Sequence, residues 1–173
     1  MSATLLESQS FERATFTPQL LRSAFGCFPS GVVAVCAEVD GVSEVLIASS
    51  FVTVSLEPPL VAIFPQTTSQ TWPRLARAER LGVSILSEQQ AGLARSMSAR
   101  TGDRFADANV TRSDGGALLV DGASVWMEVS LESSSPAGDH EFVLLGIERV
   151  TVHEAEPTVF HSSKFRQLID LHS

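Results

Sequence analysis

The sequence predicts a mainly β protein with a few helices, of the α+β class, in which the strands form one small closed barrel. Three observations lead to this prediction. Short β-branched runs recur along the chain, turn residues such as Asp40-Gly41 and Pro58-Pro59 separate them, and few segments show helical spacing. A doubly wound parallel sheet is disfavoured, because long helices do not alternate with the strands and no GxGxxG motif occurs.

The N-terminal half is expected to start with a flexible arm over residues 1–15, because this stretch is polar and lacks a periodic pattern. One domain is expected over 16–173, since a chain of 173 residues can bury a core of useful size. Apolar residues at helical spacing predict a helix between Pro18 and Gly26. Three β-branched runs then predict strands, at residues 31–39, 44–57 and 60–64.

The second half is expected to alternate polar loops with further strands. Ser87 is expected to cap a helix, because an acidic and an amide side chain follow it in the first turn. We expect a loop and short helix over 66–80, a strand over 81–86, a helix over 87–99, a crossing loop over 101–117, a strand over 123–133, and one bent strand or a strand pair over 140–155.

The chain carries 12 basic and 20 acidic side chains, which gives a formal net charge of −8. This charge argues against non-specific binding to nucleic acid or to an anionic membrane, since both need a basic surface. No apolar run approaches the length of about 18 residues that spans a bilayer, and no secretory signal is visible, so a cytoplasmic protein is expected. Cys27 and Cys36 are expected to be reduced core residues rather than a disulfide.

Hydroxyl side chains are concentrated in the expected strand over 44–57. Alternation along a strand would place Ser49, Thr53 and Ser55 on one face and Ser50 on the other. Such a strand suits either a half-solvated edge or a polar wall that faces a flat, hydrogen-bonding ligand. The pattern leaves both interpretations open.

The loop that leads into the expected short helix is also rich in hydroxyls, which lie between Thr67 and Thr71. Hydroxyls beside the free N–H groups of a helix start suit a phosphate. A solvated helix face with ordinary turn residues is the alternative. Positive charge follows at helical spacing, from three arginines expected on one helix face: Arg74, Arg77 and Arg80.

Among the four histidines, His140 alone lies between a glycine-containing loop, expected over 133–137 and Gly138, and an apolar strand. Beside Asp139, its ring could donate a hydrogen bond to an amide of a ligand. No pair of histidines has metal-ligand spacing with a nearby carboxylate, so no metal site is expected. A triad of Ser49, His140 and Asp103 is disfavoured, because the GxSxG nucleophile elbow is missing.

The order of several motifs along the chain resembles the flavin reductase family. These motifs are FGCFPSGVVAV, ASSFVTVSLEPPLVAIF, TSQTW, GDRF, GDHEFVLL and PTVFHSSKFRQL, and they run from about Phe16 to Leu168. The resemblance implies an FMN-binding split β-barrel and an NAD(P)H:flavin oxidoreductase. It also implies a homodimer with flavin sites near the interface, and a flavin-dependent monooxygenase or halogenase as the partner that receives reduced flavin.

The resemblance implies a role for individual residues. His140 matches the position beside the nicotinamide and is the expected catalytic residue, while Ser69 and Thr71 resemble the family's phosphate loop. Residues 47–50 match a strand that contacts the isoalloxazine ring and the ribityl chain. The full set expected to bind flavin or nicotinamide is Ser30, Ile47, Ala48, Ser49, Ser50, Phe64, Gln66, Ser69, Thr71, Arg104, His140, Lys164 and Phe165.

The implied reaction is hydride transfer from nicotinamide C4 to flavin N5, for which the main task of the protein is alignment. The flavin is FAD or FMN, with FAD favoured, and it is either a bound prosthetic group or a substrate. NADH is favoured over NADPH, because no cluster for a 2′-phosphate is visible. One alternative is a non-catalytic flavin carrier or sensor, but such a protein would not need His140 to position a nicotinamide. Another is an oxidase of a phosphorylated vitamin, which would need a more basic second phosphate site.

Overall fold

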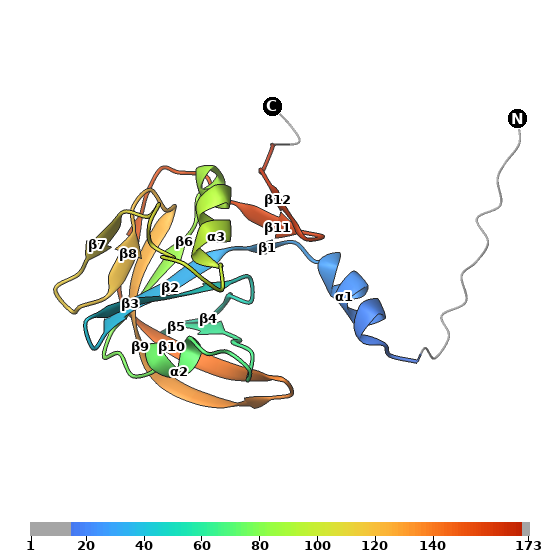
Figure 1. Cartoon of the computed structure of the whole chain (residues 1–173), viewed down its shortest axis with the longest axis horizontal. Helices are drawn as coiled ribbons and strands as arrows, with labels where there is room; N and C mark the ends of the chain where they lie inside the picture. Colours follow the sequence, from blue (N-terminus) through green and yellow to red (C-terminus); the bar gives the residue numbers. More distant parts are fainter. Residues whose placement is uncertain (1–14, 171–173) are drawn as a thin grey trace, which may run out of the picture.

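Antiparallel β-structure dominates the computed structural model, which describes residues 15–170 (Figure 1). Almost all of the expected arm over 1–15 therefore lies outside the described residues. The helices are α1 (Pro18–Gly26), α2 (Trp72–Leu75), the 3₁₀ turn η1 (Glu88–Gln90) and α3 (Ala91–Met97). The strands are β1 (Ser30–Gly31), β2 (Val33–Val39), β3 (Val42–Ala48), β4 (Val52–Leu56), β5 (Pro59–Ile63), β6 (Leu81–Ile85), β7 (Val110–Arg112), β8 (Leu118–Val120), β9 (Val125–Ala137), β10 (His140–Val152), β11 (Val159–His161) and β12 (Lys164–Arg166).

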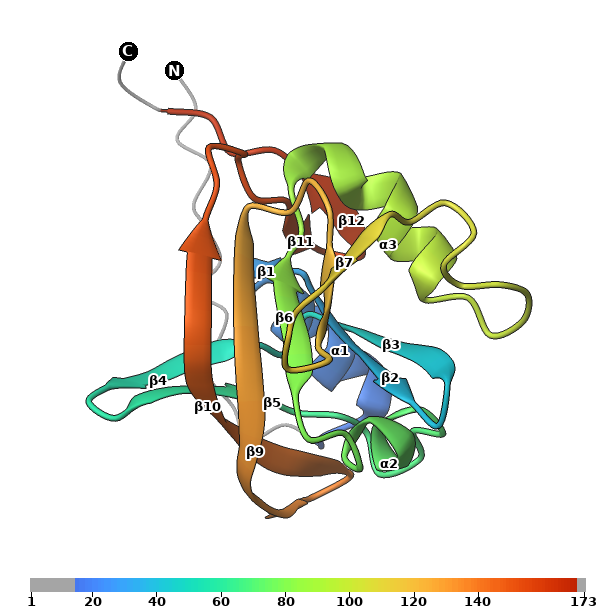
Figure 2. The ribbon, with the colours of Figure 1, turned by 90° about the vertical axis from the view of Figure 1, so that its left-hand side faces the viewer.

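The main sheet has seven strands in the order β3-β2-β6-β9-β10-β5-β4 (Figure 2). β3 and β4 lie at its opposite edges, although residues 49–51 alone join them along the chain. A link of this length spans at most about 14 Å, so the sheet must curl until its edges approach each other here. No hydrogen-bonded pairing within residues 15–170 joins β3 to β4, so the barrel is split along this seam. The closed barrel expected from the strand pattern is therefore wrong, and the split barrel is confirmed.

The expected single strand over 44–57 is instead two strands, which are interrupted at 49–51. Ser49 consequently does not share a strand face with Thr53 and Ser55, because β3 and β4 belong to opposite edges of the sheet. Val, Thr and Phe surround the break and favour a strand, whereas Ala48, Ser49 and Ser50 are the weak strand formers at which it occurs.

The long hairpin of β9 and β10 contains a second correction. The expected loop over 133–137 is the end of β9, and it pairs with the first residues of β10. Ladder hydrogen bonds hold this exposed serine run in a strand despite its turn-like composition. The segment expected over 140–155 is one strand with two register shifts, and the expected crossing loop over 101–117 contains β7.

Two local predictions are confirmed. Asp40 and Gly41 form the two-residue turn between β2 and β3, with φ of 52° and 77°. Positive φ at both positions is typical of the type I′ turn that joins twisted strands. Ser87 begins η1 with a capping box, in which its side chain and that of Gln90 each accept a hydrogen bond from the other residue's backbone.

The core lies on both faces of β2. Val33 and Val35 belong to a cluster inside the barrel, and Ala34 and Cys36 belong to a second cluster under α3 and β8, which also contains Met97. Burying a valine or leucine side chain stabilises a fold by roughly 1.5–3 kcal/mol, so both clusters support the strand that leads to the seam. Cys36 is a buried free thiol, as predicted.

Helix α1 projects from the body and buries none of its residues (Figure 1). Its last carbonyl, on Gly26, accepts hydrogen bonds from the backbone N–H and the hydroxyl of Ser162, at 3.0 and 3.1 Å. Cys27 follows α1 and is exposed, so its predicted place in the core is wrong. None of the helices in the described part of the chain has the length and apolar character needed to cross a membrane.

Candidate functional site

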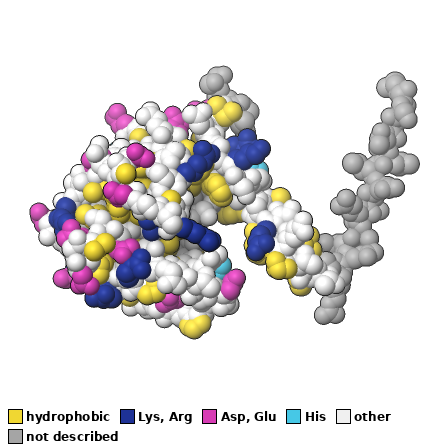
Figure 3. All heavy atoms as spheres, in the orientation of Figure 1, with side chains coloured by type: hydrophobic (Ala, Val, Ile, Leu, Met, Phe, Trp, Pro, Cys, Tyr) yellow, Lys and Arg dark blue, Asp and Glu magenta, His cyan; other side chains and the backbone are white. Residues whose placement is uncertain are grey.

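A polar hollow of about 890 Å³ lies at the seam of the split barrel. Its walls come from the end of β3 and residues 49–50, the loop before α2, the residues after α3 and the start of β10. Figure 3 shows basic and histidine side chains on the side of the body that faces α1. The lining residues are Glu44, Leu46, Ile47, Ala48, Ser49, Ser50, Phe64, Pro65, Gln66, Thr68, Ser69, Gln70, Thr71, Arg74, Ser98, Arg100, Arg104 and His140.

Most of the residues predicted to bind flavin or nicotinamide line this hollow, although they come from separate parts of the sequence. They are Ile47, Ala48, Ser49, Ser50, Phe64, Gln66, Ser69, Thr71, Arg104 and His140.

The remaining three predicted residues lie elsewhere. Phe165 lines an adjoining hollow of about 290 Å³, which also contains Ile47 and Ser49. Ser30 pairs with β11 and Lys164 lies on β12, in the small three-stranded sheet, and neither lines the two hollows. Their prediction rested on motif order alone, and Lys164 directly precedes Phe165 on β12, so strand alternation places its side chain on the opposite face.

The adjoining hollow has an aromatic and basic wall. The guanidinium carbon of Arg95 lies 5.0 Å from the centre of the Phe165 ring, within the range of a cation–π interaction. Phe160 packs against the same ring with its centroid 5.3 Å away. Such a wall suits a planar base or ring stacked beside the first hollow.

Ser50 lines the hollow, but its hydroxyl is bonded to the backbone of Phe64. Its hydroxyl donates to the carbonyl oxygen of Phe64 and accepts from the Phe64 N–H, both at 3.2 Å. These bonds fasten the link between β3 and β4 to the end of β5. Because the proton of Ser50 is already engaged, Ser49, which lines both hollows, is the better hydroxyl for a bound ring.

The hydroxyl loop before α2 is held by its own side chains. Ser69 Oγ accepts from the N–H of Trp72 at 3.1 Å, and Thr71 Oγ1 accepts from Arg104 at 3.3 Å. Arg104 also donates through Nε to the carbonyl oxygen of Met97 at 2.6 Å, so it ties this loop to the end of α3. α2 is a single turn, and its first N–H, on Trp72, is already bonded to Ser69. A phosphate here would depend on side-chain donors.

The three arginines predicted on one helix face diverge, because α2 ends before two of them are reached. Arg74 lines the hollow and forms an ion pair with Glu44 of β3. Arg77 instead pairs with Asp40 at 2.7 Å, and both side chains are exposed. The predicted row of positive charge on one helix face is therefore wrong. Of these three arginines, Arg74 alone lines the hollow.

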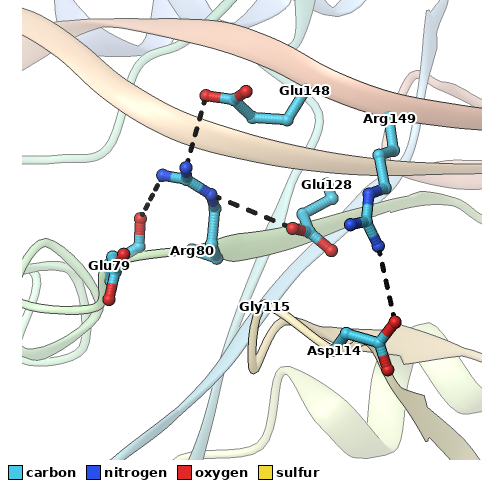
Figure 4. Close-up of a pocket in the computed structure, with 7 residues that line it drawn as sticks. All are labelled: Glu79, Arg80, Asp114, Gly115, Glu128, Glu148 and Arg149. Carbon is cyan, nitrogen blue, oxygen red and sulfur yellow. Dashed lines mark hydrogen bonds and ion pairs between the residues drawn. The ribbon is translucent and has the colours of Figure 1, made fainter.

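Arg80 belongs to a third hollow, of about 420 Å³, which Figure 4 shows. It lies 3.9 Å from Glu128 and 3.7 Å from Glu148. Glu128 is 5% exposed and lies under Gly115, where an added Cβ would come within 2.3 Å of its carboxylate. This cluster holds the turn between β7 and β8 against β9, and it shares no residue with the seam.

His140 lies at the rim of the hollow, fixed by its neighbours. Its Nδ1 donates to Asp139 Oδ1 at 2.7 Å, and this hydrogen bond lowers the pKa of Asp139. The carbonyl oxygen of Asp139 accepts from the N–H and the hydroxyl of Thr67, at 3.0 and 3.1 Å. With Nδ1 engaged, Nε2 is the ring nitrogen left for a ligand.

Sequence reasoning missed several lining residues, or did not assign them to a ligand: Glu44, Leu46, Pro65, Thr68, Gln70, Arg74, Ser98 and Arg100. Alternation back from Ala48 along β3 would have found Leu46 and Glu44. Ser98 and Arg100 follow α3, and their place at the seam depends on how that helix packs, which no local signal shows.

The charge of the hollow is opposite to that of the whole chain. Its described lining residues include three arginines and one acid, whereas the protein carries −8. Burial lowers the pKa of Arg104, and the hydrogen bond to Glu44 raises the pKa of Arg74. Guanidinium groups stay charged at neutral pH, so the hollow attracts an anion.

These side chains suit a flat polar ligand with an anionic tail. Hydroxyl and amide groups, three arginines and a histidine line its walls. Among residues 15–170 no group of three or more His, Cys, Asp or Glu is placed to hold a metal ion.

Comparison with known proteins identifies the family to which this chain belongs. A family model described as Flavin reductase like domain matches residues 25–168. A flavin reductase of Pseudomonas putida is 34% identical over 145 residues, which are 83% of this chain and 85% of that protein. The reductase subunit HsaB of a flavin-dependent monooxygenase from Rhodococcus jostii is 30% identical over 149 residues, 86% of this chain and 76% of that subunit. The crystal structure of an NADH:FAD oxidoreductase from Streptomyces globisporus, in complex with NAD and FAD fragments, is similar with a TM-score of 0.85 at 28% identity, covering 93% of this chain and 100% of that chain.

Proposed function

Because the chain belongs to the flavin reductase family, we propose that it transfers hydride from NADH to FAD or FMN and supplies the reduced flavin to a flavin-dependent monooxygenase. The observation that carries this proposal is the hollow at the seam, whose lining combines a histidine, several hydroxyl groups and three arginines. The family relation supports the oxidoreductase class, and the names of the relatives support the kind of partner.

The residues of the hollow favour one orientation of a bound flavin. The ring would lie along the backbone of residues 47–49, and the phosphate would lie near Ser69, Thr71 and Arg104, whose positions are tied together by hydrogen bonds. Nε2 of His140 would face the nicotinamide at the rim. The flavin supplies the electron-accepting chemistry when bound, and the protein supplies alignment of the two rings.

FAD and NADH are the proposed pair. The adjoining hollow with Phe165 and Arg95 offers a stacking wall for a second ring system, which FAD has and FMN lacks. A structurally similar protein is described as an NADH:FAD oxidoreductase, which supports the same choice.

A homodimer is the proposed assembly. Large apolar residues on and beside α1 are 45–78% exposed, and the edge strand β4 exposes three more. An exposed apolar helix and an unpaired strand edge both gain from burial against another copy of the chain. These residues are Phe16, Leu20, Phe25, Phe28, Val52, Val54 and Leu56.

Light scattering on the purified chain tests this assembly. Twice the mass of 18.5 kDa is expected, and Leu20→Asp combined with Phe25→Asp is expected to give a monomer. A wild-type monomer at micromolar concentration would contradict the proposal.

The enzymatic proposal is tested by mixing catalytic amounts of protein with NADH and excess FAD, FMN or riboflavin. NADH absorbance should fall at a rate proportional to protein concentration, faster with FAD than with FMN and slower with NADPH as the donor. A flavin carrier or sensor would bind flavin without consuming NADH. That result would exclude the reductase and support the alternative.

A further inference from the structure

Glu44 is a carboxylate inside the wall of the hollow proposed for flavin. Its side chain is 12% exposed, and it is the one acidic residue among the described residues that line the hollow. Arg74 reaches it with two groups: Nε donates to Oε1 and a terminal nitrogen donates to Oε2, the latter at 3.1 Å. This is the bidentate geometry in which a guanidinium binds a carboxylate or a phosphate most strongly.

The pair therefore occupies one bidentate edge of the Arg74 guanidinium and neutralises its charge. A phosphate at the loop of Ser69 and Thr71 would have to compete with Glu44 for this guanidinium, and it would also face the charge of the carboxylate. The same charge acts on Arg104, where it raises the pKa against the larger lowering by burial. Glu44 is thus within electrostatic reach of two of the arginines of the hollow.

We propose that Glu44 weakens the binding of the flavin phosphate by holding Arg74, and so keeps the flavin exchangeable. The inference rests on the proposed function and goes beyond it, since it names the residue that makes flavin a substrate instead of a resident group. An anion site with three free arginines would hold a phosphate tightly, whereas one arginine of this site is already neutralised.

The chain contains a matched control on the same hairpin. Asp40 pairs with Arg77 at 2.7 Å, three residues along the chain from Arg74, but neither residue lines the hollow. Asp40→Asn and Glu44→Gln each remove one negative charge and release one arginine. Both substitutions change the net charge of the protein equally. A difference in flavin affinity between the two variants therefore arises from the position of Glu44 in the hollow.

The experiment measures the dissociation constants of FMN and riboflavin for each variant by flavin fluorescence. Glu44→Gln should bind FMN about tenfold more tightly, since a charge-assisted bond to phosphate is gained. Riboflavin, which has no phosphate, should bind within about twofold of wild type, and Asp40→Asn should change neither constant by more than that. Glu44→Asp keeps the charge and should retain wild-type affinity for FMN, which guards against a folding effect of the amide.

The double variant Glu44→Gln with Arg74→Gln should lose the gain, because the released arginine is then absent. Unchanged FMN affinity in Glu44→Gln, an equal gain for riboflavin, or a gain that survives in the double variant would each overturn the inference. A wild-type protein that binds no flavin at all would instead refute the proposed function.

Discussion

Arg104 has a structural role and an electrostatic role, and replacing it with methionine or with lysine tests the two. Arg104 holds the carbonyl oxygen of Met97 at 2.6 Å and Thr71 Oγ1 at 3.3 Å, and it carries a positive charge in the half-buried wall of the hollow. Methionine fills a similar volume but removes the hydrogen bonds and the charge. The substitution should therefore lower both the stability of the protein and its affinity for flavin phosphate.

The hydrogen bonds that Arg104 would lose determine how far the free energy of unfolding falls. A hydrogen bond from a charged donor contributes about 1.5–3 kcal/mol, and the longer bond to Thr71 adds little, so a loss near 2 kcal/mol is expected. For a chain of this size that lowers Tm by about 4–8 °C. Two unit charges about 5 Å apart attract by about 3 kcal/mol at an effective dielectric constant of 20. Salt and water reduce this to about 1.5 kcal/mol, which raises the Kd for FMN about tenfold.

Thermal unfolding and flavin fluorescence measure the two effects separately. Arg104→Lys keeps the charge and loses the planar fork, so it should lose stability while keeping most of the affinity for FMN. Riboflavin should bind Arg104→Met nearly as well as it binds wild type. If Arg104→Met loses stability but binds FMN with unchanged affinity at low salt, Arg104 is purely structural and the phosphate lies elsewhere.

Three further predictions test the rim, the loop and the thiols. His140→Ala should lower kcat/KM for NADH by about 10- to 100-fold through lost alignment while the Kd for flavin stays within about twofold; weak flavin binding with normal turnover would contradict the assignment. Ser69→Ala combined with Thr71→Ala should weaken flavin binding by about 1–3 kcal/mol in titrations, and an unchanged Kd would move the phosphate site. Burial raises the pKa of Cys36 to about 12, so this thiol stays protonated at pH 8.5. After iodoacetamide treatment of the folded protein, mass spectrometry should find the exposed Cys27 modified and Cys36 intact. Cys36 should react once the protein is unfolded.

Features that depend on a few neighbouring residues could be predicted from the sequence. The turn at Asp40-Gly41 follows from which residues tolerate positive φ, and the cap at Ser87 follows from hydrogen bonds within one helical turn. The lining of the hollow by residues 47–50 and His140 was predicted through motif order. The turn and the cap are carried by neighbouring residues, whereas the motif order extends over most of the chain.

Features that depend on strand partners could not be predicted in this way. The break at 49–51 falls within a longer run of mostly strand-forming residues, and it is explained by the opposite sheet edges that β3 and β4 occupy. The serine run over 133–137 has the composition of a loop, but pairing with β10 makes it a strand. α1 shows the reverse case, because its apolar stripe predicts a helix correctly but says nothing about what the stripe packs against.

The sequence by itself determined the β-rich class, the order of most elements and the residue types needed at a flavin site, because these follow from local propensity and motif order. The tertiary structure alone decided that the barrel is split, that the Ser50 hydroxyl binds the backbone of Phe64, and that Arg74 rather than Arg77 enters the hollow beside Glu44. The physical reason is the same in each case. Charge and hydrogen bonding act through space over a few ångströms, and only the folded chain places residues distant in sequence within that range.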